Sequence, residues 1–201
     1  MEGISAILLA AGESTRMGRL KALVSWQGLA LVEYQVQSLQ SAGVTEVVLV
    51  VGHRGDEVEA PVKGMPGVKV VVNPDYRQGK ATSVKAGLRQ LFSSTQGILV
   101  LAVDQPRPPY IMETLIEAHL EGDALITYPV YRGHTGHPLI FASSLLPEML
   151  AITEEGQGLR EVTQRHSGET HRVEVDSPTV TVDLNSPEDL RQAEGLFEGI
   201  K

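Results

Sequence analysis

The sequence of 201 residues contains no cysteine. That absence excludes a disulfide framework, cysteine-ligated zinc, an iron–sulfur cluster and a thiol nucleophile. Long apolar runs are also absent. The run near the start, Ile7–Ala11, is shorter than the core of a signal peptide, and no stretch approaches the roughly 18 apolar residues of a membrane span. We therefore expect a cytoplasmic protein without a membrane partner.

Basic residues are not in surplus, since the formal net charge is −8. Nucleic-acid binders usually carry a basic field, so no nucleic-acid partner is expected. The acidity is concentrated after residue 145, whereas the stretch from Ser14 to Val32 contains Arg16, Arg19 and Lys21 and no acid. The early part of the chain is therefore compatible with an anionic ligand.

What the chain does contain is an ordinary globular composition, with 42% hydrophobic and 21% charged residues. Its length favours a single domain over residues 1–201. Four runs rich in Val, Ile and Leu do not alternate with polar residues, which is typical of strands buried on both faces. Amphipathic stretches at 31–42, 82–91 and 111–120 lie between them and predict helices. The four apolar runs cover residues 4–10, 47–51, 68–72 and 98–103.

The alternation of strands and helices predicts an α/β domain with a mainly parallel sheet. After about residue 124 the pattern changes. Residues 124–130 and 138–141 predict strands joined by a small β-excursion, and 170–175 and 179–184 predict two further strands. A final helix is expected from Ser186, because serine, proline and a carboxylate occupy its cap, first and third positions.

The first predicted strand leads into a glycine-rich loop that ends at Lys21. Small residues let a backbone approach a ligand closely, and successive N–H groups in such a turn bind anions. Arg16 and Lys21 add charge-assisted contacts. Gly12 and Gly18 have neither the spacing of a P-loop nor that of a dinucleotide fingerprint. The residues therefore predict an anion-binding loop of another kind.

Two aspartates, Asp104 and Asp183, end apolar runs. Aspartate is rarely buried unpaired, so a cation is a natural partner for each. Two carboxylates, completed by phosphate oxygens and waters, suit Mg²⁺. Taken alone, Asp104 fits a helix N-cap ahead of Pro108 equally well. The histidines show no spacing typical of transition-metal ligands.

Residues 9–21 read Leu-Ala-Ala-Gly-x-Ser-x-Arg-Met-Gly-x-x-Lys and resemble the signature of the MobA-like nucleotidyltransferases. Within that family they are most similar to the molybdenum cofactor cytidylyltransferases. Residues 73–83, 103–106 and 136–138 resemble further family segments. The resemblance implies a Rossmann-like three-layer domain that binds a nucleoside triphosphate and Mg²⁺. It also implies transfer of the nucleotidyl group to a phosphate on molybdopterin, with release of pyrophosphate.

The resemblance also assigns roles to individual residues. It gives catalysis to Arg16, Lys21 and Asp104, and Mg²⁺ binding to Asp104 and Asp183. The acceptor would contact Gln105 and His137. The residues expected to contact the nucleotide are Leu9, Ala10, Ala11, Gly12, Ser14, Arg16, Lys21, His53, Asn73, Gly79, Ser83 and Asp104.

Several choices stay open within that resemblance. Ala11 stands where guanine-specific relatives have glycine, which favours CTP over GTP. Residues 155–160 lack the aspartate of the family pattern Gly-Asp-x-Gly-x-Arg, which bears on the acceptor. A sugar phosphate or methylerythritol phosphate is an alternative acceptor, although those relatives place proline where Leu20 stands. A module that carries nucleotide or cofactor to a recipient molybdoenzyme, without catalysis, is the alternative from another class.

Overall fold

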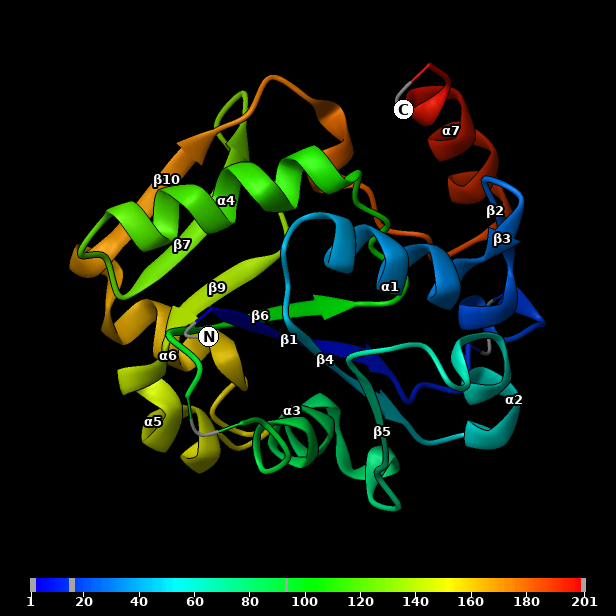
Figure 1. Ribbon diagram of the computed structural model, residues 1–201, viewed down its shortest axis with the longest axis horizontal. Helices are drawn as coiled ribbons and strands as arrows, with labels where there is room; N and C mark the ends of the chain where they lie inside the picture. Colours follow the sequence, from blue (N-terminus) through cyan, green and yellow to red (C-terminus); the bar gives the residue numbers. More distant parts are fainter. Residues whose placement is uncertain (1–2, 15–16, 93, 200–201) are drawn as a thin grey trace.

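The computed structural model describes residues 3–14, 17–92 and 94–199 and is built on an eight-stranded mixed sheet (Figure 1). The strand order is β10-β7-β9-β6-β1-β4-β5, and β8 pairs with β7 beside this path. The strands are β1 (Ile4–Ala10), β4 (Glu46–Val51), β5 (Val68–Val72), β6 (Gly97–Ala102), β7 (Ile126–Tyr131), β8 (His134–Thr135), β9 (Leu139–Ala142) and β10 (Thr170–Glu174).

The centre of the sheet is β1, which pairs in parallel with β4 on one side and β6 on the other. The chain moves outward from β1 to β4 and β5, and then returns to β6 across β1. Between β6 and β7 lies β9, which is antiparallel to both. Open α/β sheets bind ligands at the carboxyl ends of strands where the winding direction reverses. In this sheet that point lies between β1 and β6.

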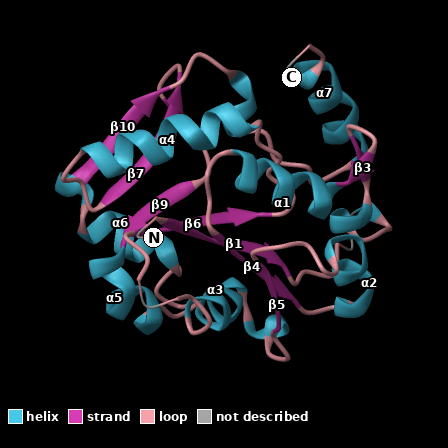
Figure 2. Ribbon diagram, in the orientation of Figure 1, coloured by secondary structure: helices cyan, strands magenta, loops and turns pink. Residues whose placement is uncertain are grey.

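Helices cover both faces of the sheet (Figures 1 and 2). One face carries α1 (Leu31–Ser41), α4 (Pro109–Glu121) and α7 (Pro187–Phe197), and the other α3 (Lys80–Leu88), α5 (Leu146–Ala151) and α6 (Leu159–Arg165). Alternate β1 residues serve the two layers: Leu8 packs in the first core and Ile7 in the second, both 0% exposed. The expected three-layer α/β domain with a mainly parallel sheet is confirmed.

Smaller elements complete the fold. A two-stranded sheet joins β2 (Ser25–Trp26) to β3 (Leu29–Ala30), and α2 (Gly55–Glu59) follows β4. The sequence did not indicate these elements, nor α5 and α6, because each is short. Single 3₁₀ turns occur at Lys21–Leu23, Ala60–Val62, Tyr76–Gln78, Ser143–Leu145, Ser167–Glu169 and Pro178–Thr181. Within the described ranges, no helix is long and apolar enough to cross a bilayer.

Two sequence expectations about strands are wrong. Residues 68–72 form a strand, but it lies at the sheet edge and is only partly covered, with Val72 62% exposed. Residues 179–184 form no strand; a 3₁₀ turn occupies Pro178–Thr181. The carbonyls of Val180 and Val182 accept hydrogen bonds from a buried arginine side chain rather than from a neighbouring strand. The apolar pattern there records burial of Val180 and Leu184, not pairing.

The expected β-excursion and the cap of the last helix are both present. Tyr131 and His134 close the β7–β8 hairpin. The Ser186 hydroxyl accepts the Asp189 amide proton at 3.2 Å, and the Asp189 carboxylate accepts the Ser186 amide proton at 2.8 Å. At its far end, α7 packs Phe197 edge-on against buried Trp26, with ring centroids 4.9 Å apart. Helix α7 therefore fixes the segment that precedes it against the sheet.

Candidate active site

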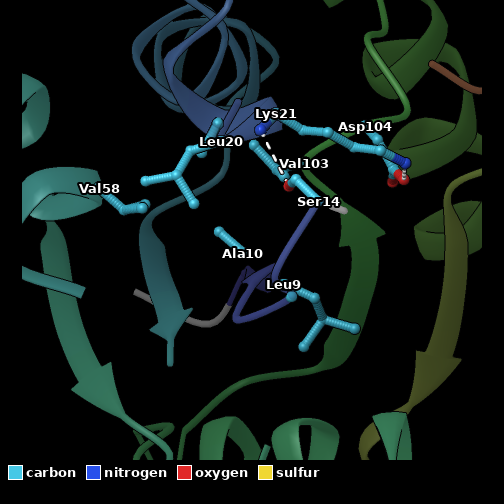
Figure 3. A pocket seen from close by; sticks show the side chains of 10 residues that line it. Leu9, Ala10, Ser14, Leu20, Lys21, Val58, Val103 and Asp104 are labelled. Atoms are coloured by element: carbon cyan, nitrogen blue, oxygen red, sulfur yellow. Dashed lines mark hydrogen bonds and ion pairs between the residues drawn. The ribbon is translucent and has the colours of Figure 1, made fainter. Parts of the chain in front are cut away.

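A cavity of about 210 Å³ lies at the carboxyl ends of β1 and β6, and residues of the glycine-rich loop help to line it (Figure 3). Ser14 has a left-handed backbone, with φ of 56°, and its hydroxyl accepts the Lys21 amide proton at 3.0 Å. Ser14 therefore joins the two ends of the loop. Arg16 lies outside the described residues, so its expected role stays a prediction. The cavity is lined by Leu9, Ala10, Gly12, Ser14, Leu20, Lys21, Ala22, Val58, Val103 and Asp104.

Lys21 joins three segments that are distant in the sequence. Its Nζ donates to Asp104 Oδ2 at 2.7 Å and to Asn185 Oδ1 at 2.9 Å. The Lys21 and Asp104 side chains are only 13% and 26% exposed, so water screens this ion pair less than a surface pair. Asp104 is not an N-cap, because Pro108 caps α4 without a side-chain bond. The Asp104 side chain instead lines the 210 Å³ cavity with the Lys21 ammonium beside it (Figure 3).

A second cavity of about 290 Å³ continues from the first, since Leu9, Gly12 and Asp104 line both. Ala11, Tyr76, Lys80, Ser83 and Ala102 complete its walls. Ala11, Gly12 and Ser83 are among the residues expected to contact the nucleotide, and all three line this cavity.

Two other residues expected at the nucleoside lie behind this wall. The Asn73 amide nitrogen donates to the hydroxyls of Ser83 and Thr82, each at 2.9 Å. Its side-chain oxygen accepts the Asp75 amide proton at 3.0 Å. His53 donates its amide proton to the Ala11 carbonyl at 3.1 Å. Neither Asn73 nor His53 is among the described residues that line the cavity. Asn73 instead holds Ser83, and His53 holds Ala11, and both of these residues do line it.

Gly79 approaches a side chain that the sequence did not single out. A Cβ at Gly79 would stand 2.5 Å from Glu154 Oε2, and the Gly79 φ of 119° also favours glycine. The same carboxylate oxygen accepts the Ala81 amide proton at 2.9 Å, at the start of α3. Glu154 is 73 residues from Ala81 in the sequence, so no local pattern could have placed it here.

A third cavity, of about 430 Å³, lies on the other side of Lys80 and Ala102. It contains both residues expected at the acceptor, Gln105 and His137. Buried Gln105 is held by its backbone carbonyl, which accepts the Gln35 side-chain amide proton at 2.7 Å. Apolar walls with a few polar groups at defined positions are typical of small-molecule sites. The apolar lining comes from Ala81, Val84, Val100, Ala102, Leu139, Ile152 and Leu159, and the polar or charged lining includes Lys80, Glu154 and Arg160.

His137 is neutral at physiological pH. Burial, followed by the nearby Arg107 charge, lowers the pKa of its imidazole to about 4. A neutral imidazole offers a hydrogen bond but no positive charge. The neutral ring therefore suits hydrogen bonding to an uncharged group of a ligand better than charge pairing with a phosphate.

The low pKa of His137 predicts a pH-dependent stability. The imidazole of an unfolded chain has a pKa near 6.5. Between pH 6.5 and 4 the unfolded chain therefore binds more protons than the folded protein, and stability decreases as the pH is lowered. We expect His137→Gln to abolish about 2 kcal/mol of the stability lost by the wild type between pH 7.5 and pH 5. Urea unfolding at both pH values measures this difference. His134→Gln, at an exposed position, is the control and should keep the wild-type loss. An unchanged loss in His137→Gln contradicts the assignment.

Arg107 is a buried residue of this region that sequence reasoning missed. It is 0% exposed, and its guanidinium donates four hydrogen bonds to backbone carbonyls. Burial lowers the pKa of Arg107 to about 9, which leaves it charged at neutral pH. Arg107 ties the loop after β6 to the turn at His137 and to residues 180–182. The acceptors are the carbonyls of His137 at 2.7 Å, Pro106 at 2.7 Å, Val182 at 2.9 Å and Val180 at 2.8 Å.

The second predicted metal ligand, Asp183, lies exposed on the segment that Arg107 holds. The next residue, Leu184, donates its amide proton to the Asp104 carbonyl at 2.8 Å. The charges of Asp183 and Asp104 both act to raise the pKa values of Arg107 and His137, so both carboxylates lie near these two side chains. Across the described part of the chain, no group of three or more His, Cys, Asp or Glu side chains could hold a metal ion. A metal at these two carboxylates therefore needs further oxygen ligands from substrate and water.

The comparison with known families agrees with this geometry. Residues 6–171 match the model of the MobA-like NTP transferase domain. The chain belongs to the MobA-like NTP transferase family. The resemblance drawn from residues 9–21 and the Rossmann-like fold are both confirmed, and the chain is a nucleotidyltransferase by family.

Individual members of the family narrow the comparison. The molybdenum cofactor cytidylyltransferase of Escherichia coli K12 is 27% identical over 204 residues and covers 100% of both chains. The bifunctional IPC transferase and DIPP synthase of Rubrobacter xylanophilus is 42% identical over 139 residues, but this chain spans only 30% of its length. A nucleotidyl transferase structure from Methanothermobacter thermautotroptrophicus has a TM-score of 0.83 and 27% identity, and covers 98% of this chain and 99% of its own.

Proposed function

We propose that this nucleotidyltransferase moves a nucleotidyl group, CMP in preference to GMP, from a nucleoside triphosphate to the terminal phosphate of a molybdopterin-type cofactor, with release of pyrophosphate. The observation that carries the proposal is the Lys21–Asp104 ion pair at the junction of the β1 loop and the end of β6. A cation and a carboxylate there face adjoining cavities of about 210 and 290 Å³. The whole chain would act as one domain, with a recipient molybdoenzyme as a further partner.

The carboxylates of Asp104 and Asp183 suit Mg²⁺. This ion is usually bound by one or two carboxylates, while phosphate oxygens of the substrate and waters fill its other coordination positions. When bound, the ion would supply positive charge to the triphosphate oxygens during transfer. Lys21 would exchange Asp104 for a phosphate oxygen of the nucleotide, keeping the ammonium in the same small region. The amide groups of the glycine-rich loop add hydrogen-bond donors for the same phosphates.

The transfer itself needs positioning and charge stabilisation rather than a protein nucleophile. An oxygen of the acceptor phosphate attacks the α-phosphorus, and the bond from that phosphorus to the bridging oxygen breaks. The electron pair leaves with pyrophosphate. Lys21 would stabilise the charge that develops on this leaving group.

The third cavity supports a flat, partly apolar acceptor. Its volume is about 430 Å³, and its walls are apolar with neutral His137 and buried Gln105 beside them. A fused heterocycle with a phosphate at one end matches that lining. Ala11 in the nucleoside cavity supports cytosine, since its methyl group narrows the space for a base.

The deciding experiment is a pyrophosphate-release assay with Mg²⁺. CTP, GTP and ATP are each combined with molybdopterin, a polyol phosphate, a sugar phosphate or methylerythritol phosphate. We expect release with CTP and molybdopterin to exceed every other pair by at least tenfold in kcat/KM. Preference for one of the other phosphates would overturn the acceptor, and preference for GTP would overturn the base. Binding of nucleotide with no release from any pair would favour a non-catalytic delivery module.

A further inference from the structure

Lys80 lies between the two cavities that the proposed function assigns to the nucleotide and to the acceptor. It lines both the 290 Å³ cavity with Ser83 and Asp104 and the 430 Å³ cavity with Gln105 and His137. Ala102 and Lys80 are common to the two linings, and an alanine methyl carries no charge. Lys80 is therefore a charged side chain that lines both cavities.

Lys80 occupies a position where a lysine lowers the stability of its helix. It is the first residue of α3, and a cation at a helix N-terminus opposes the helix dipole. The first turn of α3 contains no acidic residue of its own. The compensating carboxylate comes from Glu154, which accepts the Ala81 amide proton at 2.9 Å. A residue that works against local stability beside a ligand cavity is typical of a functional position.

The backbone at Lys80 is fixed while its ammonium is not engaged. Gly79 packs against Glu154, and Asn73 holds Thr82 and Ser83 at 2.9 Å each. Among the described residues, the Lys80 Nζ has no hydrogen-bond or ion-pair partner, whereas Lys21 is held by Asp104 and Asn185. After burial and Arg107, the charge of Lys80 also contributes to the low pKa of His137, so it acts on the acceptor cavity.

We propose that Lys80 is a catalytic residue that contacts the acceptor phosphate as it meets the α-phosphate of the nucleotide. This inference rests on the proposed nucleotidyl transfer. Two anionic groups must approach there while one phosphorus–oxygen bond forms and the bond to pyrophosphate breaks. Lys21 and the two carboxylates serve the triphosphate side. Lys80 stays protonated throughout and supplies positive charge on the acceptor side, which lowers the repulsion in the transition state.

The test compares Lys80→Met, which keeps most of the side-chain stem, with Lys85→Met on the same helix. Steady-state kinetics use the best triphosphate and acceptor pair of the wild type, and calorimetry gives the Kd of that triphosphate with Mg²⁺. We expect Lys80→Met to lower kcat by roughly 100-fold. Nucleotide Kd should stay within about threefold and the melting temperature should not fall, because a cation leaves the start of α3. Lys80→Arg should recover at least a tenth of the wild-type kcat, and Lys85→Met should match the wild type.

Each other result overturns the inference. An unchanged kcat in Lys80→Met removes Lys80 from the reaction, and a weaker nucleotide Kd with unchanged kcat assigns it to nucleotide binding alone. If Lys80→Met does not fold, Lys80→Arg decides the question. A folded Lys80→Arg protein with no more activity than a reaction without enzyme would contradict a role based on positive charge. If the wild type releases no pyrophosphate from any pair, the proposed function fails, independently of Lys80.

Discussion

Asp104→Asn is expected to reduce the rate of pyrophosphate release by about 100- to 1,000-fold. The change removes a negative charge from the end of β6, where Asp104 faces the cavity under the glycine-rich loop. An amide oxygen is a weaker Mg²⁺ ligand than a carboxylate, so more Mg²⁺ should be needed for the remaining activity. The fold should survive, because asparagine still offers an oxygen to Lys21, which lies 2.7 Å from the carboxylate.

The measurement is the initial rate of pyrophosphate release against Mg²⁺ concentration, with circular dichroism to check folding. Asp123→Asn is the matched control. Asp123 is exposed and precedes β7, which runs in the same direction as β6. Asp123 therefore lies at the amino ends of these strands, whereas Asp104 lies at their carboxyl ends. Asp123→Asn should keep the wild-type rate. Retention of more than a third of the wild-type rate in Asp104→Asn contradicts the role of Asp104.

The sequence predicts the parts of this site that depend on neighbours in the chain. The glycine-rich loop, Lys21 and Asp104 stand next to apolar strands, and the carboxyl ends of parallel strands meet at one edge. The cap of α7 is equally local, because Ser186 and Asp189 are three residues apart. Patterns of this kind are set by backbone geometry and by burial, which short sequence windows record.

The remaining features arise from contacts between distant segments. Lys21 and Asp104 are 83 residues apart, so their pairing follows from the strand order rather than from any motif. Glu154 reaches the start of α3 in the same way. Residues 179–184 form no strand for a related reason: the side chain of buried Arg107 and the backbone amide of His137 supply hydrogen bonds that a neighbouring strand would have supplied. Apolar periodicity reports burial and does not specify which donor pairs with a carbonyl.

Arg107→Met is expected to lower the free energy of unfolding by at least about 3 kcal/mol. Methionine fills part of the space but donates no hydrogen bond. The carbonyls at Pro106, His137, Val180 and Val182 would lose four donors that stand at 2.7–2.9 Å. The Val180 carbonyl would keep the His137 amide proton, which it accepts at 3.0 Å, whereas the other three buried acceptors would carry a desolvation cost.

Urea unfolding at pH 7.5 measures this change. Arg191→Met is the control, because Arg191 forms an exposed pair with Glu188 within one helix and should change stability by less than about 0.5 kcal/mol. A loss below about 1 kcal/mol in Arg107→Met would show that water or relaxed backbone satisfies the four carbonyls instead.

Arg107→Lys separates stability from positioning. Lysine keeps the charge, but its compact ammonium has three donors and lacks the planar fork that reaches four carbonyls on three segments. The segments that carry Asp104, His137 and Asp183 should then lose their alignment in a folded protein. We expect kcat to fall by about tenfold or more and the Mg²⁺ requirement to rise, while nucleotide Kd stays within about threefold, since a misplacement of about 1 Å can cost 100-fold in rate. A folded Arg107→Lys protein with wild-type kcat and Mg²⁺ dependence would limit the role of Arg107 to stability. A lower kcat with an unchanged nucleotide Kd would instead mean that Arg107 aligns the segments that carry Asp104 and Asp183 with the segment that carries His137.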